Sequence, residues 1–267
     1  MSGGQDARRE PRTVVVTGSA SGIGQSAADL LRAAGDKVIG VDKDETDVVA
    51  DLSTPEGRSG AVAQALELAG GTIDGVVACA GLASQSDLDV KVNFFGVVEF
   101  LQGCRPALAR SSQPRAVVVS SIASLHGRDD ELLAACEALD EPRALARARE
   151  LTVDGPAPAL YSGSKLAVAR WVRSSAVSDE WAGAGITLNA VGPGMVATPM
   201  SAARRASAEG RAQAERAVPS KLGTWLPPEA IAHPLVWLVS RDNTHLTGQV
   251  IFVDGGAEAV LRGPEAV

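Results

Sequence analysis

Short apolar segments rich in valine and isoleucine alternate along the chain with longer stretches rich in alanine and leucine. The apolar segments predict strands at residues 13–18, 37–42, 47–51, 73–81, 116–121, 187–192 and 250–254. The stretches between them predict helices near residues 23–35, 54–70, 90–110, 160–183 and 228–240. A continuous run such as Val14-Val15-Val16 indicates a strand covered on both faces, which is typical of a parallel sheet between helix layers. The pattern predicts an α/β fold with a doubly wound parallel sheet.

Residues 127–155 interrupt this alternation with two short helical patterns on either side of Pro142. Proline suits the first turn of a helix, and Gly155-Pro156 is typical of a helix end. The first pattern is acidic and the second carries arginines, so we expect an antiparallel helix hairpin with complementary charge. We therefore divide the chain into a flexible N-terminal tail at residues 1–12 and a single domain at 13–267, which carries the hairpin as an inserted lobe.

Composition and charge narrow the class of protein. The 267 residues are 45% hydrophobic and 21% charged, which suits one well-packed domain. A net charge of −7 argues against nucleic acid or an anionic membrane as partner. The chain has no apolar run long enough to span a bilayer and no secretory signal pattern, so we expect a cytoplasmic protein. The cysteines and histidines lack metal-ligand spacing, which predicts no metal site.

A glycine-rich turn, Thr17-Gly18-Ser19-Ala20-Ser21-Gly22-Ile23-Gly24, follows the first predicted strand and opens a helix. Gly18 permits a sharp turn, Gly22 removes side-chain bulk where a pyrophosphate would approach, and Gly24 allows close packing of helix and strand. The N–H groups and dipole at the helix start favour phosphate. In this strand–turn–helix context the motif predicts a dinucleotide site.

Two aspartates extend that site. Asp42 ends the second predicted strand, where its carboxylate can bind the adenosine ribose hydroxyls and repel a 2′-phosphate, which favours NAD over NADP. The neighbouring Lys43 weakens this preference. Asp51 and Leu52 follow the third predicted strand and can line an adenine pocket, although Asp51 can equally cap the next helix.

Candidate acid–base chemistry lies at Tyr161, the only tyrosine. Lys165 lies one helical turn further on, so the phenol and the ammonium can face one cleft. A nearby positive charge lowers the pKa of a tyrosine toward working pH, as a general acid or base requires. The alternative is an interfacial tyrosine with a solvated lysine, and the glycine-rich turn upstream favours the catalytic interpretation.

Three further polar residues accompany this pair. Ser120 and Ser121 end the fifth predicted strand, at the sheet edge where ligands bind in open α/β folds. One hydroxyl can donate to a substrate oxygen, and the other is expected to cap the next turn. Asn93, followed by Gly96 inside a helical pattern, predicts a locally kinked helix with a freed carbonyl that can hold a water.

In the order and spacing of these motifs, the chain resembles the short-chain dehydrogenase/reductase family over essentially its whole length. The resemblance implies a seven-stranded Rossmann sheet and a catalytic tetrad of Asn93, Ser121, Tyr161 and Lys165. It assigns cofactor binding to Gly18, Ser21, Gly22, Ile23, Gly24, Asp42, Asp51, Leu52, Ala80, Gly81, Tyr161, Lys165, Pro193, Gly194, Val196 and Thr198. By the same match, Pro193-Gly194 and Thr198 hold the nicotinamide carboxamide.

The chain departs from the family pattern at two places. Ala78-Cys79-Ala80-Gly81 stands where most members have Asn-Asn-Ala-Gly, so the hydrogen bonds of those asparagines are absent. The hairpin also sets Ser121 and Tyr161 farther apart than usual. With it, the chain is similar to the subgroup of bacterial 3α-hydroxysteroid dehydrogenase/carbonyl reductases, with coniferyl-alcohol dehydrogenases as near relatives. In that subgroup the hairpin is expected to block the usual tetramer contact and favour a homodimer, while a tetramer stays possible.

The activity that this resemblance implies is NAD-dependent interconversion of a small hydrophobic alcohol and its carbonyl, of the 3α-hydroxysteroid dehydrogenase/carbonyl reductase type. An aromatic, coniferyl-type alcohol is the alternative substrate. Residues 195–225 are expected to form a substrate lid, with an apolar wall formed by Met195, Met200, Leu222 and Trp225. Core packing is the alternative role for each of these four residues. A different class of protein, a redox sensor that binds NAD without turnover, is disfavoured because the full tetrad is present.

Overall fold

A computed structural model describes residues 10–223 and 225–266. It forms a seven-stranded sheet in the order β3-β2-β1-β4-β5-β6-β7, and every neighbouring pair is parallel. The strands are β1 (Thr13–Thr17), β2 (Lys37–Asp42), β3 (Val48–Val49), β4 (Gly75–Ala78), β5 (Arg115–Val119), β6 (Thr187–Pro193) and β7 (Val250–Val253). The predicted doubly wound, seven-stranded fold is confirmed.

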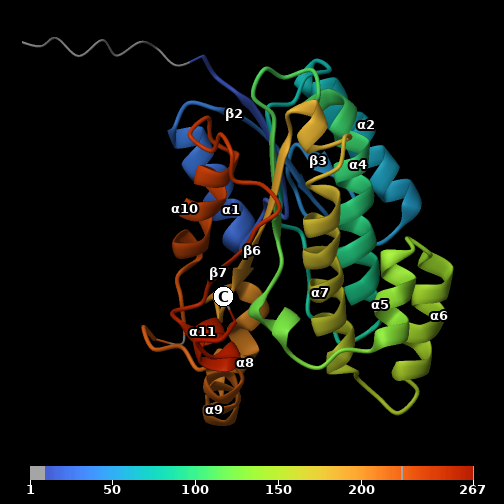
Figure 1. The fold of residues 1–267 in the computed structure, drawn as a ribbon, viewed down its shortest axis with the longest axis vertical. Coiled ribbons are helices and arrows are strands. Elements are labelled where there is room, and N and C mark those ends of the chain that lie inside the picture. The colour runs from blue at the N-terminus through green and yellow to red at the C-terminus, as the bar shows by residue number, and fades with distance from the viewer. Residues whose placement is uncertain (1–9, 224, 267) are drawn as a thin grey trace, which may run out of the picture.

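Helices cover both faces of the sheet (Figure 1). One layer holds α1 (Gly22–Ala33) and α10 (Pro228–Val239), and the other holds α2 (Pro55–Ala69), α4 (Val97–Leu108) and α7 (Pro158–Ser175). The shorter helices are α3 (Asp87–Val90), the π-helix η1 (Lys91–Gly96), η2 (Ile122–Leu125), η3 (Ala182–Ala184), η4 (Pro199–Ser201), α8 (Ala202–Ala206), α9 (Ala208–Ala217) and α11 (Ala257–Arg262). Because both faces are covered, the strand residues from Val14 to Val16 and from Ala116 to Val118 are fully buried.

The structure corrects several predicted boundaries. The third and fourth strands are shorter than expected, because only Val48–Val49 and Gly75–Ala78 pair with neighbouring strands. The helix expected at 160–183 ends at Ser175. The helix expected near 90–110 is three consecutive elements, α3, η1 and α4, so the predicted distortion at Asn93 is a π-helical turn.

The predicted tail is wrong at its last residue. Arg12 is 2% exposed, and its guanidinium donates to the backbone carbonyls of Val239, Asp74 and Gln113. It therefore joins the start of β1 to α10 and to the loops before β4 and β5. The first part of the predicted tail, residues 1–9, lies outside the described residues.

The stretch at 127–155 forms two helices, α5 (Asp130–Glu137) and α6 (Glu141–Leu151), which lie beside the lower part of α7 in Figure 1. Asp129 and Asp140 accept hydrogen bonds from the first turns of these helices, from Leu132 N–H and Arg143 N–H. Across the hairpin, Arg147 pairs with Asp129 at 2.7 Å. Opposite charge and N-terminal caps thus hold the lobe together.

The lobe packs on the helix that carries Tyr161. Its buried face includes Leu132, Leu133 and Cys136, all part of the main hydrophobic core. A Cβ atom on Gly163 of α7 would lie 3.2 Å from Leu132, so the glycine lets α5 approach closely. Within the described residues, none of the helices has the length and apolar character needed to cross a membrane.

Candidate active site

The glycine-rich turn brings three separate loops into contact. Gly18 has a φ of +70°, which favours glycine, and a Cβ there would lie 2.9 Å from the backbone of Ala80. A Cβ on Gly24 would lie 2.1 Å from the carbonyl oxygen of Gly18, so only glycine lets α1 start this close to β1. Gly22, with a φ of +56°, lies against Thr198, since a Cβ there would be 3.1 Å from its methyl carbon. Residues from three predicted cofactor-binding segments therefore meet.

The start of α1 suits a bound pyrophosphate. Ser21 occupies the N-cap position, but among the described residues its hydroxyl makes no capping hydrogen bond, and the first turn holds no acidic side chain. The first N–H groups of a helix that are not capped in this way favour an anion. The residues from Ser21 to Gly24 thus fit the phosphates of a dinucleotide.

The two predicted adenosine-side aspartates are placed differently. The Asp42 carboxylate accepts a hydrogen bond from Ala20 N–H in the glycine-rich turn at 2.9 Å, so it lies at that turn. Asp51 accepts from Ser53 N–H at 2.9 Å, which lowers the pKa of its carboxyl. The cap of α2 is Thr54, whose hydroxyl accepts from Gly57 N–H at 3.0 Å, so the alternative role of Asp51 as a helix cap is wrong.

Asn93 and Lys165 meet beneath Gly81. A Cβ on Gly81 would lie 3.0 Å from the amide oxygen of Asn93 and 3.2 Å from the ammonium of Lys165. Asn93 is fully buried; its amide donates to Leu82 O at 2.9 Å and to Ser164 Oγ at 3.1 Å. The π-helical turn presents Asn93 in this position, and such turns are frequent at functional sites.

Lys165 and the serine pair connect α7 to the end of β5. The ammonium of Lys165, which is 4% exposed, donates to Val119 O at 2.9 Å. Ser120 donates to the backbone carbonyl of Lys165 at 2.8 Å, so its hydroxyl has a structural partner. Ser121 caps the next turn, through Ala123 N–H at 3.1 Å, and lies near enough to Tyr161 to lower the pKa of its phenol. The four predicted catalytic side chains therefore gather between η1, β5 and α7.

The expected lowering of the Tyr161 pKa by Lys165 is wrong in this arrangement. Burial raises the pKa of the phenol, the nearby Ser121 side chain and the charge of Arg204 lower it, and the charge of Asp89 raises it further. Burial also lowers the pKa of Lys165 to about 8. Desolvation thus outweighs the nearby charges for both groups.

The predicted substrate lid is closed at its base by backbone pairing. Ala197 N–H donates to Leu226 O, and Leu226 N–H donates to Met195 O, each at 2.8 Å. Between these ends the chain forms η4, α8 and α9. Met200 is 56% exposed and Leu222 is 89% exposed. Neither side chain is therefore enclosed, as a residue of the expected apolar wall would be. Residue 224, which falls within the predicted lid, lies outside the described residues.

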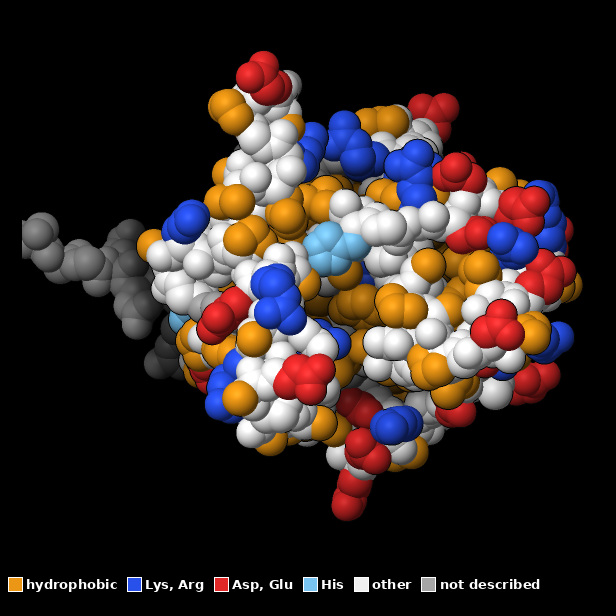
Figure 2. All heavy atoms as spheres, turned by 90° about the horizontal axis from the view of Figure 1, so that it is seen from below, with side chains coloured by type: hydrophobic (Ala, Val, Ile, Leu, Met, Phe, Trp, Pro, Cys, Tyr) orange, Lys and Arg blue, Asp and Glu red, His pale blue; other side chains and the backbone are white. Residues whose placement is uncertain are grey.

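Figure 2 shows the molecule from below the view of Figure 1, the side on which α8 and α9 of the predicted lid lie. This face is hollowed near its centre, where hydrophobic side chains form the floor and charged side chains lie toward the rim. The Nε of Arg205 and the indole N–H of Trp225 are buried without a hydrogen-bond partner among the residues that the structure describes. Arg205 also donates to the carbonyl of Thr198 at 3.4 Å, a contact between two parts of the predicted lid.

Sequence reasoning missed the positioning roles of two residues, Thr17 and Asp89. Thr17 accepts hydrogen bonds from Cys79 N–H at 3.1 Å and Ala80 N–H at 3.0 Å, and so fixes the loop after β4. Asp89 is fully buried and accepts from Ser84 N–H at 2.8 Å. Hydrophobic periodicity does not indicate either residue. The signal that could have found them is a polar side chain at a glycine-rich turn, for Thr17, or beside a serine-rich turn, for Asp89.

Comparisons with known proteins agree with this geometry. The model of the short chain dehydrogenase family matches residues 12–131, and that of enoyl-(acyl carrier protein) reductase matches residues 148–258. The residues between the two matches lie in the α5–α6 lobe. The 3-alpha-hydroxysteroid dehydrogenase/carbonyl reductase of Comamonas testosteroni is 37% identical, with 93% of this chain and 97% of that protein aligned. The chain belongs to the short-chain dehydrogenase/reductase family.

Two further members of the short-chain dehydrogenase/reductase family are similar over nearly their whole length. The solved structure of the 3-alpha-hydroxysteroid dehydrogenase from Pseudomonas sp. B-0831, complexed with NADH, is 40% identical, covers 94% of this chain and 99% of that chain, and has a TM-score of 0.87. The 3beta-hydroxysteroid dehydrogenase 1 of Eggerthella lenta is 30% identical, with 92% of this chain and 93% of that protein aligned. The predicted family is therefore confirmed.

Proposed function

We propose that this protein is an NAD(H)-dependent oxidoreductase that interconverts a hydrophobic secondary alcohol, foremost a 3α-hydroxysteroid, and its carbonyl. The observation that carries the proposal is the meeting of Asn93, Ser121, Tyr161 and Lys165 beside a glycine-rich turn whose helix start suits a pyrophosphate. The steroid class is supported by the Comamonas and Pseudomonas relatives, which share most of this chain.

The residues that would hold the cofactor follow from the site. Residues Ser21 to Gly24 would bind the pyrophosphate, Asp42 the adenosine ribose, and Lys165 the nicotinamide ribose. Pro193, Gly194, Val196 and Thr198 would flank the nicotinamide, which when bound supplies the hydride acceptor or donor. The carboxylate of Asp42 supports NAD rather than NADP, because a 2′-phosphate beside it would meet like charge.

Tyr161 exchanges the proton of the substrate oxygen. In alcohol oxidation the phenolate takes the hydroxyl proton as the C–H hydrogen leaves with its electron pair, and in carbonyl reduction the phenol returns it. Ser121 donates a hydrogen bond to the same oxygen. Because burial raises the pKa of Tyr161, the phenol is in its donating form at neutral pH, which suits carbonyl reduction.

Replacing the phenol tests the proposal. In Tyr161→Phe we expect turnover to fall by about 10²–10⁴-fold because the proton donor is lost, while NADH binds as before. Turnover is followed by NADH absorbance with a panel of hydroxysteroids and aryl alcohols, and binding is followed by calorimetry. Retained turnover in the variant would overturn the catalytic role of Tyr161. Aryl alcohols turning over faster than every steroid would favour the coniferyl-type substrate, and NADH binding without any turnover would favour a redox sensor.

We also propose a homodimer that forms through β7 and its neighbours. β7 is the edge strand next to β6, and all four of its residues are only partly buried. Elsewhere in the C-terminal part of the chain, Trp237 of α10 and Leu261 of α11 expose 45% and 42% of their surface. A second copy would cover this apolar edge. Light scattering on the purified protein distinguishes a dimer from a tetramer.

We also propose that the enzyme is cytoplasmic, because its three free thiols are stable in a reducing compartment.

A further inference from the structure

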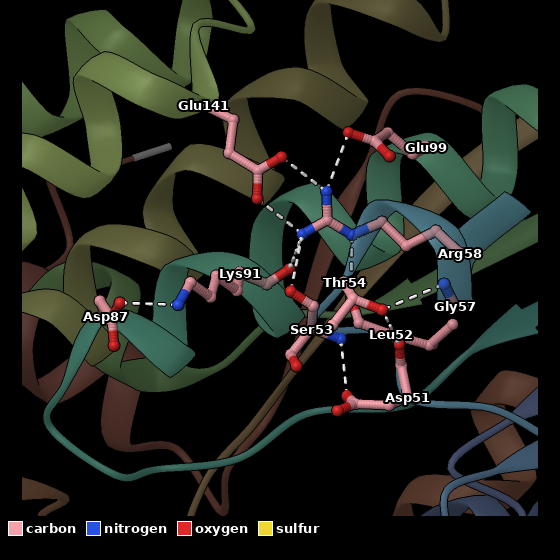
Figure 3. A network of polar contacts seen from close by, with 10 residues as sticks. All are labelled: Asp51, Leu52, Ser53, Thr54, Gly57, Arg58, Asp87, Lys91, Glu99 and Glu141. Carbon is pink, nitrogen blue, oxygen red and sulfur yellow. Dashed lines mark hydrogen bonds and ion pairs between the residues drawn. The ribbon is translucent and has the colours of Figure 1, made fainter.

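Arg58 of α2 is a charged side chain buried outside the catalytic tetrad. It is 1% exposed, although moving a guanidinium out of water is costly unless its donors are bonded and its charge is paired. Figure 3 shows its guanidinium at the centre of a polar network that joins segments far apart in the sequence. Packing of α2 alone does not explain why a cation is buried in this position.

The guanidinium bonds to carbonyls on one side and carboxylates on the other. Its Nε donates to Leu52 O at 2.9 Å, and one terminal nitrogen donates to Lys91 O at 3.2 Å and Ser53 O at 3.4 Å. Both terminal nitrogens bind the carboxylate of Glu141, at 2.7 and 2.8 Å, and one also binds Glu99 at 3.0 Å. The side chain therefore satisfies its donors and pairs its charge with two carboxylates.

The partners of Arg58 come from three parts of the molecule around the site. Leu52 and Ser53 form the turn after Asp51, the segment assigned to the adenine. Lys91 begins the π-helix that carries Asn93. Glu141 begins α6 of the inserted lobe, whose other helix packs on α7. Arg58 is thus the point where the adenine-side turn, the π-helix and the lobe meet.

The turn and the π-helix are in direct contact beside Arg58. A Cβ on Gly96 would lie 3.1 Å from Leu52 O and 3.2 Å from Lys91 O, so the two segments approach each other closely at this glycine. Their two carbonyls accept from the same guanidinium, which fixes their separation more firmly than packing of backbone alone. Phe95 of the π-helix also lies under the guanidinium, with its ring centre 5.9 Å from the Arg58 carbon.

Glu141 supplies the better-buried share of the charge compensation. Its side chain is 19% exposed and binds the guanidinium through both oxygens, whereas Glu99 is 41% exposed and binds through one. Burial lowers the pKa of Arg58, and the hydrogen bonds and charges of Glu141 and Glu99 reverse this effect. Without the lobe, the cation would keep its carbonyl partners but only one carboxylate, the half-exposed Glu99.

We propose that Arg58 is a positioning residue through which the docked lobe, by way of Glu141, sets the adenine-side turn at Leu52 and the π-helix that carries Asn93. The lobe then contributes to cofactor binding without touching the cofactor. This inference rests on the proposed function only in that the cofactor is NAD(H).

The experiment removes the lobe's carboxylate and leaves its fold. Glu141→Gln keeps the size and one acceptor but removes the charge, and Glu150→Gln is the matched control, since Glu150 lies on the same helix and pairs with Arg147 instead. Calorimetry gives the dissociation constants of NADH and AMP, and hydrogen exchange reports on residues 51–54 and 91–96. We expect Glu141→Gln to weaken both ligands by about 3- to 10-fold and to speed exchange in both segments. Glu150→Gln is expected to change neither.

Arg58→Lys extends the test, because an ammonium keeps the charge but cannot span the carbonyls and Glu141 together. We expect a larger loss of affinity than in Glu141→Gln, and if this variant fails to fold, Glu141→Gln alone decides. Unchanged affinity and exchange in Glu141→Gln, or equal changes in Glu150→Gln, would overturn the proposal. If the unaltered protein does not bind NADH, the proposed function fails, and the exchange in residues 51–54 and 91–96 still tests the coupling through Arg58.

Discussion

The glycine-rich turn and the proposed catalytic centre both lie against the loop at Ala80-Gly81, and they are built by opposite means. The turn depends on glycine, which has no side chain: Gly18 and Gly24 let backbone segments approach to distances at which a Cβ would collide. The centre depends on side chains that are present and buried, since Asn93 and Lys165 are each held by hydrogen bonds in the interior. The turn is specified by shape, and the centre by the compensation of desolvated polar groups.

This difference predicts different failures. A change in the turn adds atoms where there is no room, so it should reduce both stability and cofactor affinity. A change in the centre removes a group whose burial destabilises the fold, so it can raise stability while activity is lost.

The largest effect is expected at Lys165. Lys165→Met removes the buried ammonium, so we expect kcat/KM to fall by about 10²–10⁴-fold. At pH 7 the free energy of unfolding should rise by about 1–3 kcal/mol, because burial lowers the pKa of this lysine from 10.5 to about 8 and the variant no longer bears that cost. Steady-state kinetics and urea unfolding measure the two quantities.

The pH dependence sharpens this test. The unfolded lysine keeps its proton up to about its ordinary pKa of 10.5, while the folded one loses it near pH 8. The penalty is therefore complete below pH 8 and disappears as the pH rises toward 10.5, so the stability gain of Lys165→Met should shrink over that window. A gain that stays constant from pH 7 to pH 10 would mean that the lysine is not held in its desolvated state.

An intermediate effect is expected in the turn. Gly24→Ala places a Cβ 2.1 Å from Gly18 O, so the turn must shift. We expect NADH affinity to fall by about 100-fold and stability by about 1–3 kcal/mol. Gly60→Ala is the matched control: it is also a helical glycine, its Cβ meets nothing within 4 Å, and the change should stabilise α2 by about 0.5–1 kcal/mol. If the two variants change NADH affinity and stability equally, close packing at Gly24 does not explain its role.

The smallest effect is expected at Asp42, whose carboxylate accepts a hydrogen bond from the glycine-rich turn. Asp42→Ala should lower the ratio of kcat/KM for NAD over NADP by about 10-fold, because the carboxylate no longer repels a 2′-phosphate. Asp44→Ala, two residues along the chain, should leave the ratio unchanged. If the ratio is unaltered in Asp42→Ala, the preference for NAD is set by other residues.

The order of strands and helices follows from sequence alone, because buried parallel strands and amphipathic helices have distinct periodicities. The glycine-rich turn and the pair Tyr161 and Lys165 were predictable for a similar reason: each is a local pattern within a few residues. The boundaries were less predictable, since β3 is limited to Val48–Val49 by pairing with β2 rather than by its own apolar run.

Tertiary structure alone decided which groups share the interior. No local pattern indicates that Arg12 is buried against Asp74 and Val239, or that Arg58 joins Leu52, Lys91 and Glu141. Nor does one indicate that burial raises the pKa of Tyr161, where a nearby positive charge was expected to lower it. Each of these depends on contacts between distant segments and on the desolvation that follows. Periodicity records which face of an element is buried, whereas the energy of a buried charge depends on the partners that the folded chain brings to it.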